Sequence, residues 1–404
     1  SAASSDYPLR DVYKRQIVFV ALIPISIYYF IPTTFKKIVK ISIPLIVTSV
    51  FFVVVRQLIL YNTELNANAI HDVSNYSFAE MNLWQKYATI TYSLGLYLKL
   101  LFVPHPLTWD YYPYHIEIKE WNNAGVILSL IIYCVLLYKA ISGIKNKTFV
   151  SYAILIFLIP LSLTSNILFP VGAFMCERFL YISSIGFALI VSYVLVDKSK
   201  LGKYKAFSNP LWVLIPILSL YAVKTIDRNS DWKNDETLVS TDVMTSKNSL
   251  KSTSEYGNIL FYKAEKTINE SERKQYYESA LEYEEKAFNI CKNLAIPNFV
   301  LGTIYGKYKN DLTKAAYYLN NVVNLDPKNV DAYNNLGIIY CMTNNYSAAI
   351  NIFERGLKIS HNDVKILGNL AQLYSIIGQQ TKAAYYHNRL KEQQHKNQSL
   401  SVTD

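Results

Sequence analysis

Two short segments beside long apolar runs carry the residues best suited to chemistry. The first is the pair Glu177-Arg178, followed by Tyr181 where an apolar run begins. Charges at the mouth of a membrane helix are costly to bury unless they are paired or bind something, and the planar guanidinium of Arg suits a lipid phosphate. A second interpretation stays open, in which the two charges form an interfacial ion pair and Tyr181 is an aromatic anchor.

The second segment, residues 104–115, is rich in aromatic residues. Asp110 lies between Trp109 and Tyr111, so it could act as a base, accept a hydrogen bond from a sugar hydroxyl or cap a turn. Aromatic belts at a membrane surface have the same composition. The candidates for binding a substrate or a lipid phosphate are therefore Asp110, Tyr111, Glu177, Arg178 and Tyr181.

The spacing of histidines and cysteines argues against a metal site. His105 and His115 are ten residues apart with no carboxylate or thiol at ligand spacing, and the four cysteines form no C-x-x-C pair. The chain also has no phosphate-binding glycine loop, no nucleophile elbow and no H-E-x-x-H helix. We predict no metal ligands in this chain.

The elements that must position these residues follow from an uneven composition. Of the 404 residues, 51% are hydrophobic and 17% charged, whereas soluble domains are about a quarter charged. Residues 1–226 hold 19 Lys and Arg against 10 Asp and Glu, and residues 227–404 hold 21 against 20. Hydrophobicity and basic excess thus occur in the same half. This pattern indicates a membrane protein and excludes a nucleic-acid-binding face, a disulfide scaffold and a purely soluble protein.

Six apolar segments predict membrane spans, which need about 20 residues or fewer where the flanks contribute. They are Ile17–Ile31, Ile41–Leu60, Ala124–Tyr138, Phe149–Ile167, Phe179–Val196 and Leu211–Ile226. A seventh segment, Leu83–Val103, is weaker because it contains Lys86 and Lys99 and mixes Tyr, Thr and Ser with Leu.

Lysine clusters predict the topology of these segments. They occur within residues 36–40, 139–147 and 198–205, and the positive-inside rule places all three in the cytoplasm. The segment Leu83–Val103 then lies at the outer interface or re-enters the membrane; if it spans, one cluster must face outward. Everything after Asp227 is then expected on the periplasmic or lumenal side.

The C-terminal half repeats itself with a period of 34 residues. Leu336-Gly337, Tyr340, Ala349 and Phe353 match Leu370-Ala371, Tyr374, Ala383 and His387, an earlier unit begins at Leu301, and a longer, degenerate one covers Ser254–Asn293. This pattern is typical of tetratricopeptide repeats, which stack into one continuous core. Such arrays make concave surfaces that bind peptides or proteins.

Three asparagines in the repeats are candidates for lining such a groove. Asn334, Asn335 and Asn369 could bind a peptide backbone. They could equally be solvated helix positions or local caps, and the sequence does not choose between these roles.

The predicted fold is all-α, with a polytopic transmembrane helical domain followed by a tetratricopeptide-repeat α-solenoid. The domains are residues 17–226 in the membrane, a linker at 227–253, repeats at 254–397 and a tail at 398–404. Residues 1–16 lack the apolar core of a signal peptide, and Asp11–Gln16 resembles the translation of a library adaptor, although a short loop is the alternative. We expect the chain to be the C-terminal fragment of a longer protein.

Three stretches of the chain resemble the TMTC family, which are membrane glycosyltransferases of the GT-C type with C-terminal tetratricopeptide repeats. The stretches are 97–104 with 107–111, then 177–187, and finally 231–236. The resemblance implies transfer of a sugar, mannose in the well-known members, from a polyprenyl-phosphate carrier to a Ser or Thr hydroxyl. Asp110, Glu177 and Arg178 match family positions near the presumed site, which makes Arg178 a candidate phosphate contact.

The resemblance also implies a catalytic carboxylate, often with a divalent metal, in an acidic loop that would precede this chain. No carboxylate here is therefore assigned that role, no cofactor is expected in this chain, and a divalent metal would belong to the full-length enzyme. The expected partners are the lipid bilayer, a polyprenyl-phosphate-linked sugar and an acceptor protein bound by the repeats, with no nucleic acid. The alternative is a non-catalytic membrane-anchored scaffold for envelope or secretion complexes.

Overall fold

The computed structural model describes residues 17–64, 78, 81–111, 115–168, 171, 174–196 and 211–400. These residues contain helices and no strand, so the fold is all-α as predicted. The chain divides into two compact units, Ser1–Ser249 and Leu250–Asp404, and each is described by itself. The predicted adaptor segment, residues 1–16, and the lysine cluster at 198–205 lie outside the described residues.

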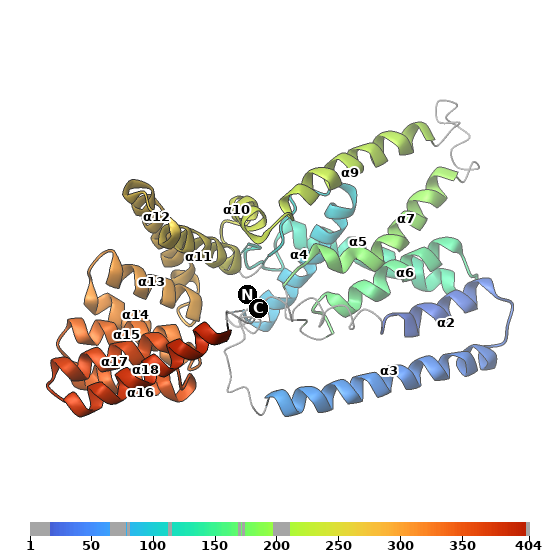
Figure 1. Ribbon diagram of the computed structural model, residues 1–404. Helices are drawn as coiled ribbons and strands as arrows, with labels where there is room; N and C mark the ends of the chain where they lie inside the picture. Colours follow the sequence, from blue (N-terminus) through green and yellow to red (C-terminus); the bar gives the residue numbers. More distant parts are fainter. Residues whose placement is uncertain are drawn as a thin grey trace. The chain divides into compact units, whose positions relative to one another are not determined.

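The first unit is a set of mostly apolar helices (Figure 1). They are α2 (Phe19–Phe30), α3 (Phe35–Glu64), α4 (Leu83–Phe102), α5 (Ala124–Ile144), α6 (Phe149–Thr164), the 3-10 turn η2 (Glu177–Phe179), α7 (Leu180–Val196), α9 (Leu211–Asp231) and α10 (Asp235–Thr245). Helix α6 is central, because it packs against α2, α5 and α7. Helices α2, α3, α6 and α9 each contain a proline, which is more common in membrane helices than in soluble ones.

Among the described residues, three segments are long and apolar enough to cross a membrane: Phe35–Val55, Ala124–Ile144 and Glu177–Leu195. Only 11%, 17% and 22% of their apolar windows are buried within the protein, so most of their side chains need lipid around them. This confirms a membrane domain. Helices α2 and α6 are apolar but shorter, and α9 is not among the three because charged residues fill its last two turns.

The seventh apolar segment forms one continuous helix, α4. Asn82 begins it with a capping box, in which its side chain accepts from the Gln85 amide and the Gln85 side chain accepts from the Asn82 amide. A buried face that includes Ala88, Ser93 and Tyr97 contributes to its packing on α5 and α7. Whether α4 spans the bilayer or lies at its outer interface stays a prediction.

A hydrophobic core lies directly beside the sequence-predicted candidates. It joins Leu94, Tyr97 and Leu101 of α4 to Phe157 and Leu161 of α6, and it includes Tyr111 and Phe179. Because Tyr111 and Phe179 are anchored in this core, the neighbouring Asp110 and Arg178 are held beside it.

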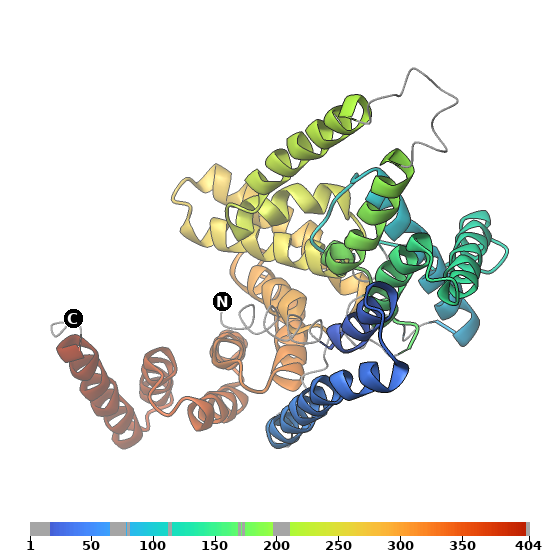
Figure 2. The same ribbon diagram turned by 90° about the vertical axis from the view of Figure 1, so that its right-hand side faces the viewer.

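The second unit consists of four helix pairs that follow one another along the chain (Figure 2). The helices are α11 (Leu250–Lys266), α12 (Glu270–Ile290), α13 (Ala295–Lys307), α14 (Leu312–Leu325), α15 (Val330–Met342), α16 (Tyr346–Ile359), α17 (Val364–Ile376) and α18 (Gln380–Leu400). The predicted linker, residues 227–253, contains the end of α9, all of α10 and the start of α11.

The 34-residue period appears in the turns between helices as well as in the hydrophobic cores. Asn310, Asn344 and Gly378 adopt positive φ angles of 53°, 56° and 78° at the turn inside successive pairs, a conformation that Asn and Gly tolerate best. Asp311 and Asn345 follow them as N-caps. The turn chemistry thus ends one helix and begins the next at equivalent places in each repeat.

Candidate functional site

The segment after α4 is held by the carboxylate at the start of the candidate span Glu177–Leu195. Glu177 lies in η2, and its Oε1 atom accepts a hydrogen bond of 2.8 Å from the Thr108 amide and another of 2.8 Å from the Tyr111 hydroxyl. Burial, and then the nearby Glu177 carboxylate, raise the pKa of Tyr111 above its ordinary value. Tyr111 therefore stays protonated and continues to donate to Glu177.

A buried ion pair lies on the other side of the same segment. Arg228, in the last turn of α9, donates through both Nη atoms to the two oxygens of Asp242 on α10, at 2.5 and 2.6 Å. Arg228 is 9% exposed and Asp242 is fully buried. Arg228 also bonds Asp231 at 3.0 Å. A bidentate geometry of this kind is the strongest form of the Arg–carboxylate pair.

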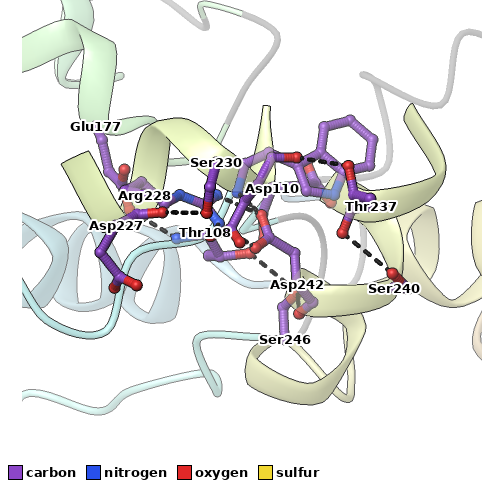
Figure 3. A network of polar contacts seen from close by, with 12 residues as sticks. Thr108, Asp110, Glu177, Asp227, Arg228, Ser230, Thr237, Ser240, Asp242 and Ser246 are labelled. Carbon is purple, nitrogen blue, oxygen red and sulfur yellow. Dashed lines mark hydrogen bonds and ion pairs between the residues drawn. The ribbon is translucent and has the colours of Figure 1, made fainter. Parts of the chain in front are cut away.

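The Glu177 and Asp242 carboxylates accept hydrogen bonds from two consecutive backbone amides (Figure 3). The Thr108 amide bonds Glu177, while the next amide, that of Trp109, bonds Asp242 at 2.6 Å. The Thr108 hydroxyl also bonds Ser246 Oγ at 3.1 Å. We call residues 108–111 the clamped segment, because side chains from η2 and α10 fix its backbone.

Asp110 is tied to the end of the first unit. The hydroxyl of Ser249 donates to its carboxylate, and its own carbonyl accepts from the Thr108 hydroxyl. The side chain that was a candidate base is thus engaged with a serine within this unit. The arrangement resembles a loop cap more than a free general base.

These carboxylates do not form a divalent metal site. Glu177 and Asp242 are both engaged by backbone amides, and Asp242 is neutralised by Arg228. Within the ranges that the structure describes, no group of three His, Cys, Asp or Glu side chains is placed to hold a metal ion. A divalent metal of the kind that the resemblance implies does not fit this donor set.

The structure brings three of the five predicted candidates together. Asp110, Tyr111 and Glu177 belong to the network, whereas the Arg178 side chain is exposed and Tyr181 is 76% exposed on the first turn of α7. Exposure at the start of an apolar helix is typical of an interfacial aromatic residue. Their roles as phosphate or substrate contacts stay predictions.

Sequence reasoning missed Arg228 and Asp242, the most buried charges of the network. Arg228 lies two residues after the apolar segment Leu211–Ile226 and precedes Asp231 by one helical turn, which is a weak local signal. Asp242 is 14 residues further along the chain, and only the fold of α10 brings it back to Arg228.

In the second unit, the three candidate asparagines form a chain of hydrogen bonds. Asn369 donates to Asn334 at 2.7 Å, Asn334 donates to Asn335 at 3.4 Å, and Asn335 donates to Thr303 at 3.2 Å. The chain crosses α17, α15 and α13, the first helices of three successive pairs. The amides thus link neighbouring repeats, and a role in binding a peptide stays a prediction.

Comparison with known proteins finds a repeat family and several curated relatives. The tetratricopeptide repeat family model matches residues 309–375. Human "Protein O-mannosyl-transferase TMTC3" is 30% identical over 143 residues, which are 35% of this chain and 14% of that protein. Xenopus laevis tmtc2 is 31% identical over 145 residues, or 34% of this chain and 16% of that protein.

A third relative, mouse TMTC1, is 25% identical over 185 residues, which are 43% of this chain and 19% of that protein. The chain thus spans less than a fifth of the length of these curated relatives. The predicted resemblance to the TMTC proteins is confirmed over about a third of the chain.

Two solved structures are partly similar to the chain. The crystal structure of MamA covers 43% of this chain and 94% of its own, at 16% identity and a TM-score of 0.36. The tetratricopeptide protein YrrB covers 48% of this chain and 90% of its own, at 16% identity and a TM-score of 0.33.

Proposed function

We propose that this chain is the membrane and acceptor-binding part of a protein O-glycosyltransferase that uses a polyprenyl-phosphate-linked sugar, with mannose as the first candidate. One combination supports the proposal: apolar helices, tetratricopeptide repeats and similarity to several protein O-mannosyl-transferases occur in a single chain. Stacked repeats bind extended peptides or proteins, so the second unit would hold the protein whose Ser or Thr receives the sugar.

In this proposal the clamped segment has a positioning role. Amides of Thr108 and Trp109 bound to Glu177 and Asp242 fix the loop that follows α4. A rigid loop beside the start of α7 would offer each substrate the same surface, and such pre-organisation is worth a large part of an enzymatic rate. We assign no residue of this chain as the base that activates the acceptor hydroxyl.

The proposed topology places the repeats on the periplasmic or lumenal side. Lys36, Lys37 and Lys40 lie in the first turns of α3, and Lys139, Lys145 and Lys147 lie around the end of α5. Both clusters would face the cytoplasm by the positive-inside rule. The acceptor would then be an exported protein.

The test is transfer of sugar by membranes that contain the complete product of the open reading frame. They are incubated with polyprenyl-phosphate [3H]mannose, and protein-bound label is counted after lipid extraction and again after β-elimination. We expect alkali-labile label on Ser or Thr, and the purified 404-residue chain is assayed in parallel.

The scaffold remains the alternative because the network is largely satisfied within the protein. Glu177, Asp242 and Arg228 all have partners inside the first unit, as expected of a structural joint. If membranes transfer no sugar from any polyprenyl-phosphate hexose while the repeats still retain envelope proteins, the scaffold is the better description.

A further inference from the structure

A cavity of about 310 Å³ opens beside the clamped segment, within the first unit. Its walls come from the last turns of α4, the loop that follows and residues 115–119, with Met175 and Asn248 closing it. Leu96, Leu100 and Met175 form apolar wall. The volume is at the small end of the range for ligand sites, about 300–1,000 Å³.

The polar lining of this cavity is mostly cationic or able to become so. Lys99, Lys119, His105 and His115 line it, against the single carboxylate of Glu117. Tyr92 and Tyr111 add aromatic faces. Lysine ammonium and imidazolium groups that approach one space from different elements suit a tetrahedral anion with several acceptor oxygens better than a flat carboxylate.

Contacts with neighbouring residues hold Lys119 in the wall of this cavity. Its side chain is 18% exposed, its Nζ atom lies 5.3 Å from the centroid of the Tyr92 ring, and its backbone amide bonds Thr89 Oγ1 at 2.9 Å. Its ion-pair partner, Glu117 at 2.9 Å, is 80% exposed. An anion in the cavity could therefore replace Glu117 at little cost, because that carboxylate can turn into solvent.

The cavity is joined to the polar network through Tyr111. Its ring lines the cavity and packs edge-on against His115, with centroids 5.3 Å apart, while its hydroxyl is held by Glu177. We propose that this cavity, with Lys99, Lys119 and the two histidines, binds a phosphate ester group. Its identification with the phosphate of the sugar donor rests on the proposed function, but binding itself does not require transfer.

The probe is farnesyl phosphoryl mannose, a short-chain phosphodiester, and binding is measured with the full chain in nanodiscs. We expect binding to weaken at least tenfold in Lys99→Met and in Lys119→Met. Lys86→Met is the matched control, because Lys86 is on the same helix but does not line the cavity, and it should bind as the unaltered chain does. Glu117→Gln should bind several-fold more tightly, a gain that a misfolded variant could not show.

Two further ligands separate the sources of the phosphate. Farnesol, which lacks the charge, should not compete, and mannose 1-phosphate should compete more weakly than the lipid if the apolar wall holds a prenyl chain. Equal competition by mannose 1-phosphate would keep the phosphate site but assign it to a soluble ester.

The proposal is overturned if Lys99→Met and Lys119→Met both bind the probe normally. Loss of binding in Arg178→Met alone would assign the phosphate contact to Arg178 instead. Failure of sugar transfer with binding intact would count against the proposed function alone.

Discussion

At the scale of single residues, the first unit depends on a few buried charges that fix one loop. Arg228 and Asp242 pair in a bidentate manner, and Asp242 and Glu177 hold the amides of Trp109 and Thr108. A buried pair of this kind contributes little beyond an apolar replacement, but removing one partner leaves an uncompensated charge. The single substitutions should therefore be far more harmful than the double one.

We predict that Asp242→Ala destabilises the first unit by about 3–5 kcal/mol, because Arg228 stays buried and loses its bidentate partner. The measurement is thermal unfolding in detergent together with hydrogen exchange of residues 104–111, which should speed up. Arg228→Met/Asp242→Leu should lose less than Asp242→Ala. Asp231→Ala is the control at the rim of the network, with an expected cost in stability below about 1 kcal/mol. Equal losses of stability in Asp242→Ala and Asp231→Ala would contradict the role assigned to the buried pair.

His115 should make the affinity of the cavity for an anion depend on pH. Burial lowers the pKa of His115 below its ordinary value of 6.5, so the ring is neutral at pH 7 and becomes cationic only as the pH falls. The other titratable groups that line the cavity are Tyr92, Lys99, His105, Tyr111, Glu117 and Lys119. A bound phosphodiester stays singly charged and favours the imidazolium, so its affinity should rise as the pH falls from 7.5 to 5.5.

His115→Gln should flatten this pH profile while leaving most of the affinity at pH 7.5. The profile is measured with the phosphodiester probe in nanodiscs, and Lys86→Met again provides the control. An unchanged slope in His115→Gln would contradict the assignment of the pH dependence to His115.

At the scale of elements, the repeats depend on close approach within each helix pair. A Cβ atom on Gly337 of α15 would meet the Phe353 ring of α16 at 2.4 Å, and one on Gly302 would meet Leu319 at 2.7 Å. Phe353 is fully buried, so its ring cannot move away. One repeat later the corresponding residues are Ala371 and the exposed His387, where the added methyl group is tolerated.

We predict that Gly337→Ala destabilises the second unit by about 1–3 kcal/mol through overpacking, despite a gain in helix propensity of up to about 1 kcal/mol. Phe353→Leu in the same chain should recover part of this loss. Gly368→Ala on α17 is the matched control, since its Cβ would lie 3.8 Å from the nearest atom, and it should be neutral or stabilising. Chemical denaturation followed by circular dichroism measures the stability of these three variants and of the unaltered chain.

The first helix pair contains a carboxyl group that the fold keeps out of water. Glu284 of α12 is fully buried, and neither of its oxygens has a hydrogen-bond partner among the described residues; Ser254 faces it outside hydrogen-bonding geometry. Burial raises the pKa of Glu284 well above its ordinary value of 4.5. The folded state thus binds this proton more tightly than the unfolded state does.

The resulting stability is fully present below about pH 4.5, the unfolded value, and is lost as the pH rises through the folded pKa of Glu284. Glu284→Gln should therefore protect α11 and α12 from hydrogen exchange at pH 8 and change little at pH 4.5. Glu284→Met should also stabilise at pH 8, by on the order of 1–3 kcal/mol for the removed unsatisfied group. Glu282→Gln, exposed on the same helix, is the control; equal effects of the two Gln variants would show that the buried proton is unimportant.

At the scale of the whole molecule, the chain contains a unit whose helices need lipid and a repeat unit with its own cores, and the boundary lies at Ser249–Leu250. The three buried clusters of the second unit draw only on residues of that unit, whereas the candidate spans of the first unit are mostly exposed and need lipid. We predict that residues 250–404 expressed alone are water-soluble and unfold cooperatively, while the full chain stays with membranes after carbonate extraction. A repeat unit that precipitates alone would show that it needs the membrane unit to fold.

The proposed topology makes a separate prediction for the whole chain. Protease added outside intact spheroplasts should digest the repeats, and inverted vesicles should protect them. The opposite pattern would place the repeats in the cytoplasm and exclude an exported acceptor.

The sequence by itself determined the fold class, the apolar segments and the 34-residue period, because hydropathy and helical spacing are local properties of the chain. It also selected Asp110, Tyr111 and Glu177. Only the tertiary structure identified Arg228 and Asp242 as the centre of the network and Lys99 and Lys119 as neighbours of one cavity. Such pairs meet across 14 or 20 residues of sequence, and no local pattern specifies which distant charges will face each other once the apolar helices have packed.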